Sequence, residues 1–241
     1  MNRGAVRLQV ADLHVAYGDS CVLRGVDLEL RSGELTILTG QNGSGKTTLL
    51  NALSGFVSSR QGTAALDGRS LLGLSPAKRA ALGLGRTFQT PRVFEQIRVL
   101  DCLMLASYGG HLPPAWAALL PTPSLRASEV RHEARCRGLL ERMGWTQLAS
   151  QQAGELSHGQ RKLLALCQTC LSPATAMLLD EPVAGVDQRQ RQLAITLLGE
   201  WLERDRRHCL LVATHEPLTV PRAPSRLVHL AQGRAWKAEG P

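Results

Sequence analysis

Residues 40–47 read GQNGSGKT, which matches the phosphate-loop pattern G-x-x-x-x-G-K-T. Glycines let consecutive backbone N–H groups turn toward one anion, while a lysine and a hydroxyl can reach terminal phosphates and Mg²⁺. The apolar run LTILT precedes this loop, and the helical pattern TTLLNALSGF follows it. We therefore predict that Lys46 contacts phosphates and that Thr47 contacts Mg²⁺. A glycine-rich structural turn is the alternative interpretation.

A second group with chemical potential is the carboxylate pair in MLLDEP, where Asp180 and Glu181 end an apolar run. In a parallel sheet the carboxyl ends of the strands line one crevice, so these acids can face a nucleotide held by residues 40–47. Asp180 would then orient the Mg²⁺ shell, and Glu181 would polarise an attacking water. Without the phosphate loop, the same pair would indicate only a solvated turn.

The elements that must position these residues alternate between apolar strands and amphipathic helices. This alternation predicts an α/β fold with a largely parallel sheet covered on both faces. We expect one domain over 1–241, with a core at about 1–90 and 153–241 and a helical subdomain at about 91–152. The expected strands are VRLQV, LHVAY, VDLEL, LTILT, ATAMLLDEP and HCLLVATHEP, and the expected helices are TTLLNALSGF, PAKRAAL, RKLLALCQTCL and QRQLAITLLGEWLERD, with a closing hairpin in LVHLAQGRAWKAEGP.

Composition indicates a globular chain. Its 241 residues are 44% hydrophobic and 20% charged, which is ordinary for a domain with a sizeable core. No apolar stretch reaches the length of a bilayer helix, and the N-terminus lacks the apolar core of a signal peptide, so we predict a cytoplasmic protein. The six cysteines are scattered through apolar segments and are expected to be buried hydrophobes. The CxxC at Cys167 and Cys170 has no second cysteine pair or histidine partner, so the same is expected of it.

The net charge of +8 comes mainly from arginine. Nucleic acid or an anionic membrane face could attract such a charge. The arginines are spread along the whole chain rather than gathered in one stripe with interleaved aromatic residues. A solvated basic surface is therefore the preferred interpretation, and no nucleic-acid partner is expected.

Taken together, seven short motifs resemble the ATP-binding subunit of ABC transporters over nearly the entire chain. They occur in family order: an aromatic residue in the first strand, the phosphate loop, a glutamine in RTFQT, the LSHGQ signature, MLLDEP, AGVD and VATHE. The resemblance implies that ATP and Mg²⁺ are bound by an ABC ATPase core of the P-loop NTPase class, with an antiparallel β subdomain and an inserted α-helical subdomain. The nucleotide-binding residues that it implies are Tyr17, Gly40, Gln41, Asn42, Gly43, Ser44, Gly45, Lys46, Thr47, Thr48, Ser157, Gly159, Gln160 and Asp187.

The resemblance also assigns catalytic and metal-binding roles. Glu181, His215, Lys46 and Gln89 are implied in hydrolysis, and Thr47, Gln89 and Asp180 are implied as Mg²⁺ ligands. The signature would complete the site of a partner subunit, with the Ser157 hydroxyl and the backbone around Gly159 on its phosphates. His158 would be a permissive position between them. A helical block next to Gln89 would bind the membrane subunits.

The chain looks most like the ATPases of importers for branched-chain amino acids or for urea and short amides. The stretches that carry this resemblance are GLGRTFQTPRVFEQIRVLDCLMLA and EPVAG, and FQTPRVFE and LSHGQ lean toward the urea branch. The implied partners are integral membrane permease subunits, a second ATPase subunit or a second copy of this chain, and, indirectly, a periplasmic substrate-binding protein. The chain would lie at the inner face of the cell membrane. One alternative is a non-transport ATPase of the same superfamily acting on nucleic acid or ribosomes; another is a module that binds ATP without hydrolysing it.

Overall fold

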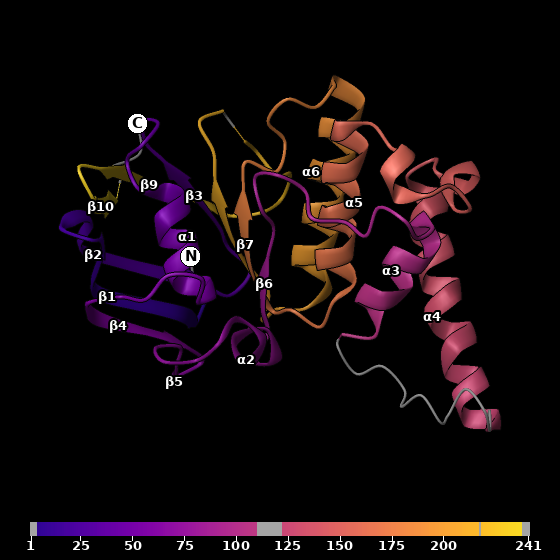
Figure 1. The fold of residues 1–241 in the computed structure, drawn as a ribbon, viewed down its shortest axis with the longest axis horizontal. Coiled ribbons are helices and arrows are strands. Elements are labelled where there is room, and N and C mark those ends of the chain that lie inside the picture. The colour runs from indigo at the N-terminus through magenta and orange to yellow at the C-terminus, as the bar shows by residue number, and fades with distance from the viewer. Residues whose placement is uncertain (1–3, 110–121, 217, 238–241) are drawn as a thin grey trace. The chain divides into compact units, whose positions relative to one another are not determined.

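The computed structural model describes residues 4–109, 122–216 and 218–237 (Figure 1). The chain forms two compact units. Unit 1 comprises Met1–Gln89, Ala174–Ala184 and Ala194–Pro241, and unit 2 comprises Thr90–Pro173 and Gly185–Leu193. The first boundary lies next to residue 90, where we expect the helical subdomain to begin. Unit 2 continues past residue 152, the expected end of that subdomain, and includes the LSHGQ signature and the AGVD segment from Gly185 onward.

Unit 1 contains a four-stranded antiparallel sheet with the order β2-β1-β4-β5. Strand β1 (Val6–Tyr17) is one continuous element with shifts in register, where two short strands were expected. Its side chains at Leu8, Val10, Leu13 and Val15 are buried. The other strands are β2 (Ser20–Arg31), β4 (Gln61–Leu66) and β5 (Arg69–Ser70). Strands β4 and β5 were not predicted, because QGTAAL and RS carry little apolar patterning.

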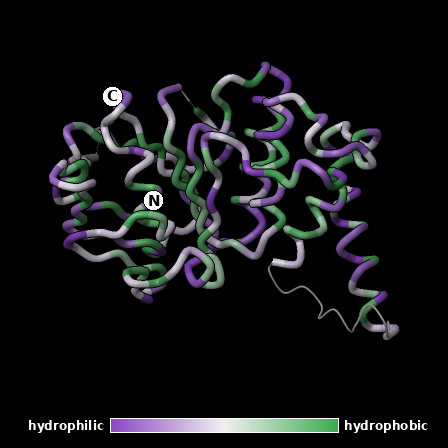
Figure 2. The backbone as a smooth tube through the Cα atoms, viewed as in Figure 1, coloured by the Kyte–Doolittle hydropathy of each residue, from purple (hydrophilic) through white to green (hydrophobic). Residues whose placement is uncertain are grey.

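The larger sheet of unit 1 has six strands in the order β10-β9-β3-β8-β7-β6, all parallel to their neighbours except β10. Every residue of β7 (Ala176–Asp180) and β8 (Cys209–Ala213) is buried, and the strands at the centre are largely green in Figure 2. The predicted parallel sheet is thus confirmed. The remaining strands are β3 (Leu35–Thr39), β6 (Leu84–Arg86), β9 (Ser225–Ala231) and β10 (Arg234–Lys237).

Strand register brings the chemically interesting segments to one edge of this sheet. Leu38 and Asp180 both pair with Ala213 of the intervening strand β8. Because β3, β7 and β8 run in the same direction, the loop after Thr39, the residue after Asp180 and the residues after Ala213 leave the sheet at the same side.

Helix α1 (Lys46–Ser54) is held at its C-terminal end by a buried arginine of α2 (Pro76–Ala81). The side chain of Arg79 donates through Nη1 to the carbonyl oxygens of Ala52 and Leu53, at 2.6 and 2.7 Å, and through Nε to that of Leu74 at 3.0 Å. Burial lowers the pKa of this guanidinium. The last carbonyls of α1, which a helix cannot satisfy internally, therefore receive a cationic donor.

Unit 2 is mainly helical. Helix α5 (His158–Leu171) contacts α3 (Val99–Ser107) through a hydrogen bond from Gln168 Nε2 to the carbonyl oxygen of Cys102, at 3.2 Å. Cys167 and Cys170 are 1% and 2% exposed, as expected for buried hydrophobes. The elements are α3 (Val99–Ser107), α4 (Pro123–Arg142), the short 3₁₀ turns Thr146–Leu148 and Ala153–Glu155, α5 (His158–Leu171) and the first residues of α6 (Gln188–Arg204).

Within the described ranges, none of the helices has both the length and the apolar character required to cross a bilayer.

Replacing Arg79 with methionine tests how α1 is held. Arg79→Met removes the donors of three carbonyl groups and is expected to lower the free energy of unfolding by about 2 to 4 kcal/mol, measured by urea denaturation. Lys78→Met, at an exposed position of α2, is the matched control and should change the free energy of unfolding by less than about 0.5 kcal/mol. Equal effects of the two substitutions would contradict the anchoring role.

Candidate active site

The loop between β3 and α1 follows a backbone path that glycines make possible. Gly45 has a φ of 106°, and a Cβ placed there would lie 2.8 Å from Leu23 Cδ2. A Cβ at Gly40 would collide with the carbonyl oxygen of Leu230. Gly43 also has a positive φ, of 78°. Alanine at Gly40 or Gly45 would therefore force the loop away from its neighbours.

The same loop leaves donors available to an anion. Helix α1 begins after Gly45 without a side-chain cap and has no acidic residue in its first turn, as far as the described residues go. The Ser44 hydroxyl oxygen is buried and has no hydrogen-bond partner in the described part of the chain. Lys46 is 8% exposed, and its Nζ donates to the carbonyl oxygens of Gly40 and Gln41 at 2.7 and 3.1 Å. An unsatisfied hydroxyl, a helix N-terminus and a lysine fit a polyphosphate group.

Asp180 links α1 to the end of β7. Its Oδ1 accepts a hydrogen bond from Thr47 Oγ1 at 3.4 Å, and its Oδ2 accepts one from Arg86 Nη2 at 3.1 Å. The carboxyl group is buried, which raises its pKa, whereas the charge of Arg86 and the hydrogen bond from Thr47 act in the opposite direction. A hydroxyl and a carboxylate oxygen held side by side are ligands that suit a hard cation such as Mg²⁺.

Glu181 and His215 form the second contact of the site. Glu181 Oε1 lies 2.9 Å from His215 Nδ1, and the side chains are 11% and 56% exposed. Glu181 has a φ of 49°, unusual for a residue with a side chain, while its N–H donates to the Ala213 carbonyl oxygen at 2.9 Å. Strain of this kind occurs at functional sites, where the surrounding structure enforces it. The arrangement can position a carboxylate beside water.

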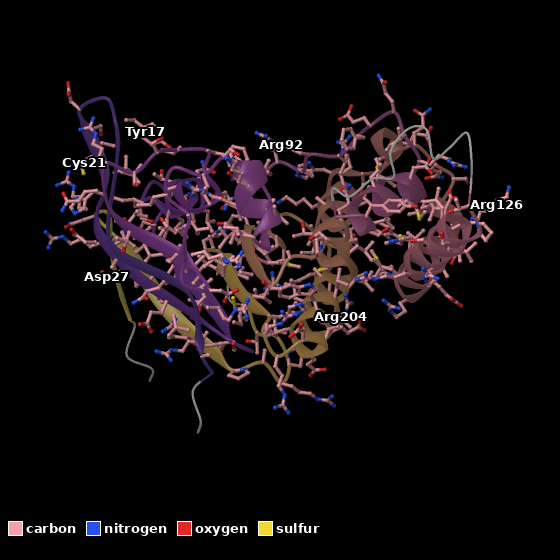
Figure 3. All side chains as sticks on the ribbon, turned by 90° about the horizontal axis from the view of Figure 1, so that it is seen from below. Tyr17, Cys21, Asp27, Arg92, Arg126 and Arg204 are labelled. Atoms are coloured by element: carbon pink, nitrogen blue, oxygen red, sulfur yellow. The ribbon has the colours of Figure 1, made fainter. Side chains whose placement is uncertain are left out.

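Two of the predicted residues lie at exposed positions of unit 1. Tyr17 ends β1, is 49% exposed and pairs with Ser20 across a turn. Figure 3 shows Tyr17 and Cys21 near each other on this hairpin. Gln89 follows β6 after Thr87 and Phe88 and is exposed. Both side chains are thus accessible to a ligand, and Thr48, in the first turn of α1, is partly exposed.

The signature residues lie in unit 2, at the start of α5. Ser157 caps the helix: its hydroxyl oxygen accepts from the Gln160 N–H at 3.2 Å, and Gln160 Oε1 accepts from the Ser157 N–H at 2.9 Å. His158 is exposed. A Cβ at Gly159 would collide with the side-chain oxygen of Gln190, and the N–H of Gln190 donates to Asp187 Oδ1 at 2.8 Å. Unit 2 thus brings the signature and Asp187 together.

Two residues beside Asp180 were not predicted from the sequence. Arg86 contacts Asp180 directly, and Asn51 Oδ1 accepts a hydrogen bond from the same arginine nitrogen, Nη2, at 3.1 Å. Burial lowers the pKa of Arg86 to about 10, so it remains cationic at neutral pH. An arginine inside the short strand LGR was the available signal, since arginine seldom lies in a buried strand without a carboxylate partner.

Comparison with known proteins identifies the family. A family model described as ABC transporter matches residues 23–184, more than half of the chain. The chain belongs to the ABC transporter family as an ATP-binding subunit. Members of this family are ATPases, and the predicted fold class, an ABC ATPase core with additional subdomains, is confirmed.

Named relatives of this ABC ATPase include two bacterial transport proteins. It is 31% identical to LivG of Salmonella typhimurium, a high-affinity branched-chain amino acid transport ATP-binding protein, over 94% of this chain and 88% of that one. It is 29% identical, with the same coverage, to BraF of Pseudomonas aeruginosa, which has the same description. Among solved structures, the ADP conformation of an ATP-binding cassette of an ABC transporter has a TM-score of 0.75 and 26% identity, covering 98% of this chain and 92% of that one.

Proposed function

We propose that this ABC ATPase powers the import of a small polar solute by binding and hydrolysing ATP at the edge of the larger sheet of unit 1. The observation that carries the proposal is the pair of contacts Thr47 with Asp180 and Glu181 with His215, next to the glycine loop. One contact supplies a place for Mg²⁺, and the other supplies a candidate general base.

In this proposal residues 40–48 hold the phosphates. The backbone N–H groups of Gly40, Gln41, Asn42, Gly43, Ser44 and Gly45 and the hydroxyls of Ser44 and Thr48 surround them, and Lys46 exchanges its two carbonyl partners for phosphate oxygens. Thr47, Asp180 and Gln89 hold Mg²⁺, which when bound neutralises charge on the phosphates. Tyr17 offers its aromatic face to the adenine base.

Glu181 acts as the general base in the proposed reaction. Its carboxylate accepts a proton from the attacking water, and the hydrogen bond to His215 keeps the carboxylate oriented. In this proposal the second ring nitrogen of His215, Nε2, contacts a terminal phosphate while Nδ1 stays with Glu181. Hydrolysis then removes the phosphate that these residues contact.

The signature residues act across a dimer in this proposal. Ser157 accepts one helix N–H as a cap and keeps its own hydroxyl proton for a phosphate of a partner subunit. Gly159 and Gln160 present the exposed start of α5 to the same phosphate, and Asp187 lies on the adjoining segment. The partner is a second ATPase subunit or a second copy of this chain.

The proposed setting is the inner, cytoplasmic face of a cell membrane. Integral permease subunits would bind the chain, and a periplasmic substrate-binding protein would act indirectly through them. LivG and BraF are named for branched-chain amino acid transport, which favours this solute class over urea and short amides. The same names favour transport over the alternative of an ATPase acting on nucleic acid or ribosomes.

Glu181→Gln tests the catalytic assignment. The variant is expected to bind ATP but to hydrolyse it at least about 100-fold more slowly, because the amide cannot accept the proton of water. It should also form an ATP-dependent dimer, measured by light scattering after gel filtration. Glu216→Gln, a nearby carboxylate outside the pair with His215, is the matched control. Normal hydrolysis by Glu181→Gln would show that another group is the base.

The solute class is tested by uptake into cells that produce the chain with its permeases. ATP-dependent accumulation of labelled leucine is expected with the wild type and should be lost with Glu181→Gln. Accumulation of labelled urea in place of leucine would contradict the branched-chain amino acid assignment. Efflux of a preloaded solute that requires Glu181 would contradict import.

A further inference from the structure

Arg86 is a buried cation that forms an ion pair with Asp180, the carboxylate that we propose as a Mg²⁺ ligand. Its side chain is 7% exposed, that of Asp180 is 2% exposed, and Nη2 lies 3.1 Å from Asp180 Oδ2. The same nitrogen donates to Asn51 Oδ1 in α1 at 3.1 Å. One guanidinium therefore connects β6, β7 and α1.

The other two nitrogen atoms of this guanidinium lack hydrogen-bond partners within the described residues. These atoms, Nε and Nη1, are both buried. The Phe88 ring lies against the group, with 5.4 Å from Arg86 Cζ to the ring centroid. A buried ion pair with unused donors is a poor source of stability, since desolvation offsets the attraction. Stability alone therefore gives no reason for a cation here.

The charges around Asp180 give a different reason. Asp180 is the last residue of β7, and Glu181 follows it. Arg86 pairs with Asp180, and Lys46 is hydrogen-bonded to the neighbouring loop. Arg86 therefore already neutralises the carboxylate that the metal would use. A divalent cation that arrived without an anion would share the Asp180 carboxylate with Arg86 and would be repelled by it.

We propose that Arg86 is a positioning residue that prevents Asp180 from binding a bare divalent cation, so that Mg²⁺ enters the site only together with a polyphosphate. The inference rests on the proposed function of Asp180. Arg86 keeps one carboxylate oxygen, Oδ2, engaged and leaves Oδ1 beside Thr47. The negative charges of a polyphosphate outweigh the repulsion from Arg86, and the metal then binds as part of the complex.

The sharpest test measures the affinity of the full-length protein for Mn²⁺ in the absence of nucleotide, from the electron paramagnetic resonance signal of free Mn²⁺. Arg86→Gln keeps a hydrogen-bonding side chain but removes the charge, and it should bind Mn²⁺ at least about 10-fold more tightly than the wild type. Arg86→Lys retains the charge and should stay near the wild type. The Arg86→Gln, Asp180→Asn double variant should lose the gained affinity.

A second measurement needs no change at Arg86 and so does not depend on the folding of those variants. Asp180→Asn should leave the affinity for bare Mn²⁺ unchanged, because the wild-type carboxylate does not bind it. The same substitution should weaken Mn²⁺ binding at least about 10-fold when inorganic tripolyphosphate is present. A loss of bare Mn²⁺ binding in Asp180→Asn would overturn the inference.

The outcomes separate the inference from the proposed function. If the wild type binds Mn²⁺ with tripolyphosphate and Arg86→Gln gains no affinity for bare Mn²⁺, Arg86 is only structural, and the nucleotide site stands. If the wild type binds neither tripolyphosphate nor Mn²⁺ together with it, the proposed nucleotide site itself is wrong. A gain in both Arg86→Gln and Arg86→Lys would assign the effect to packing rather than to charge.

Discussion

The hydrogen bond between Thr47 and Asp180 joins the first turn of α1 to the end of β7, and the rest of the site depends on this junction. Two features make it possible. Parallel pairing places Leu38 and Asp180 on either side of Ala213, and glycines carry the chain from β3 into α1 without side chains in the way. Arg79 holds the C-terminal end of α1. The N-terminal end of α1 therefore stays directed at the position where phosphates would bind.

The polar groups at this junction differ in how deeply they are buried and in whether they have hydrogen-bond partners. Asp180 is buried and bonded on both oxygens, whereas the Ser44 hydroxyl is buried and unsatisfied within the described residues. His215 is mostly exposed although it contacts Glu181. Buried groups that are already paired fix the geometry, and groups that are unsatisfied or exposed remain available to a ligand. The site is thus preorganised on the side of the sheet and adaptable on the side facing solvent.

The local parts of this arrangement could be predicted from sequence. The strand, glycine loop and helix around residues 35–54 are contiguous, and the apolar run before Asp180 indicates its strand directly. The contacts of Glu181 with His215 and of Asp180 with Arg86 join segments far apart in the chain, and no spacing encodes them. Gly159 was assigned to phosphate binding alone, yet its lack of a Cβ also accommodates Gln190. Strands β4 and β5 have too little hydrophobic pattern to predict.

We propose that the loop at residues 40–47 binds nucleotide through Lys46. The most direct measurement is the equilibrium affinity of the wild type and of Lys46→Met for fluorescent ATP, with circular dichroism to verify that both proteins are folded. Methionine keeps the apolar stem but removes the charge-assisted contacts, so the affinity should fall at least about 10-fold. Equal affinities in two folded proteins would show that Lys46 does not bind the nucleotide.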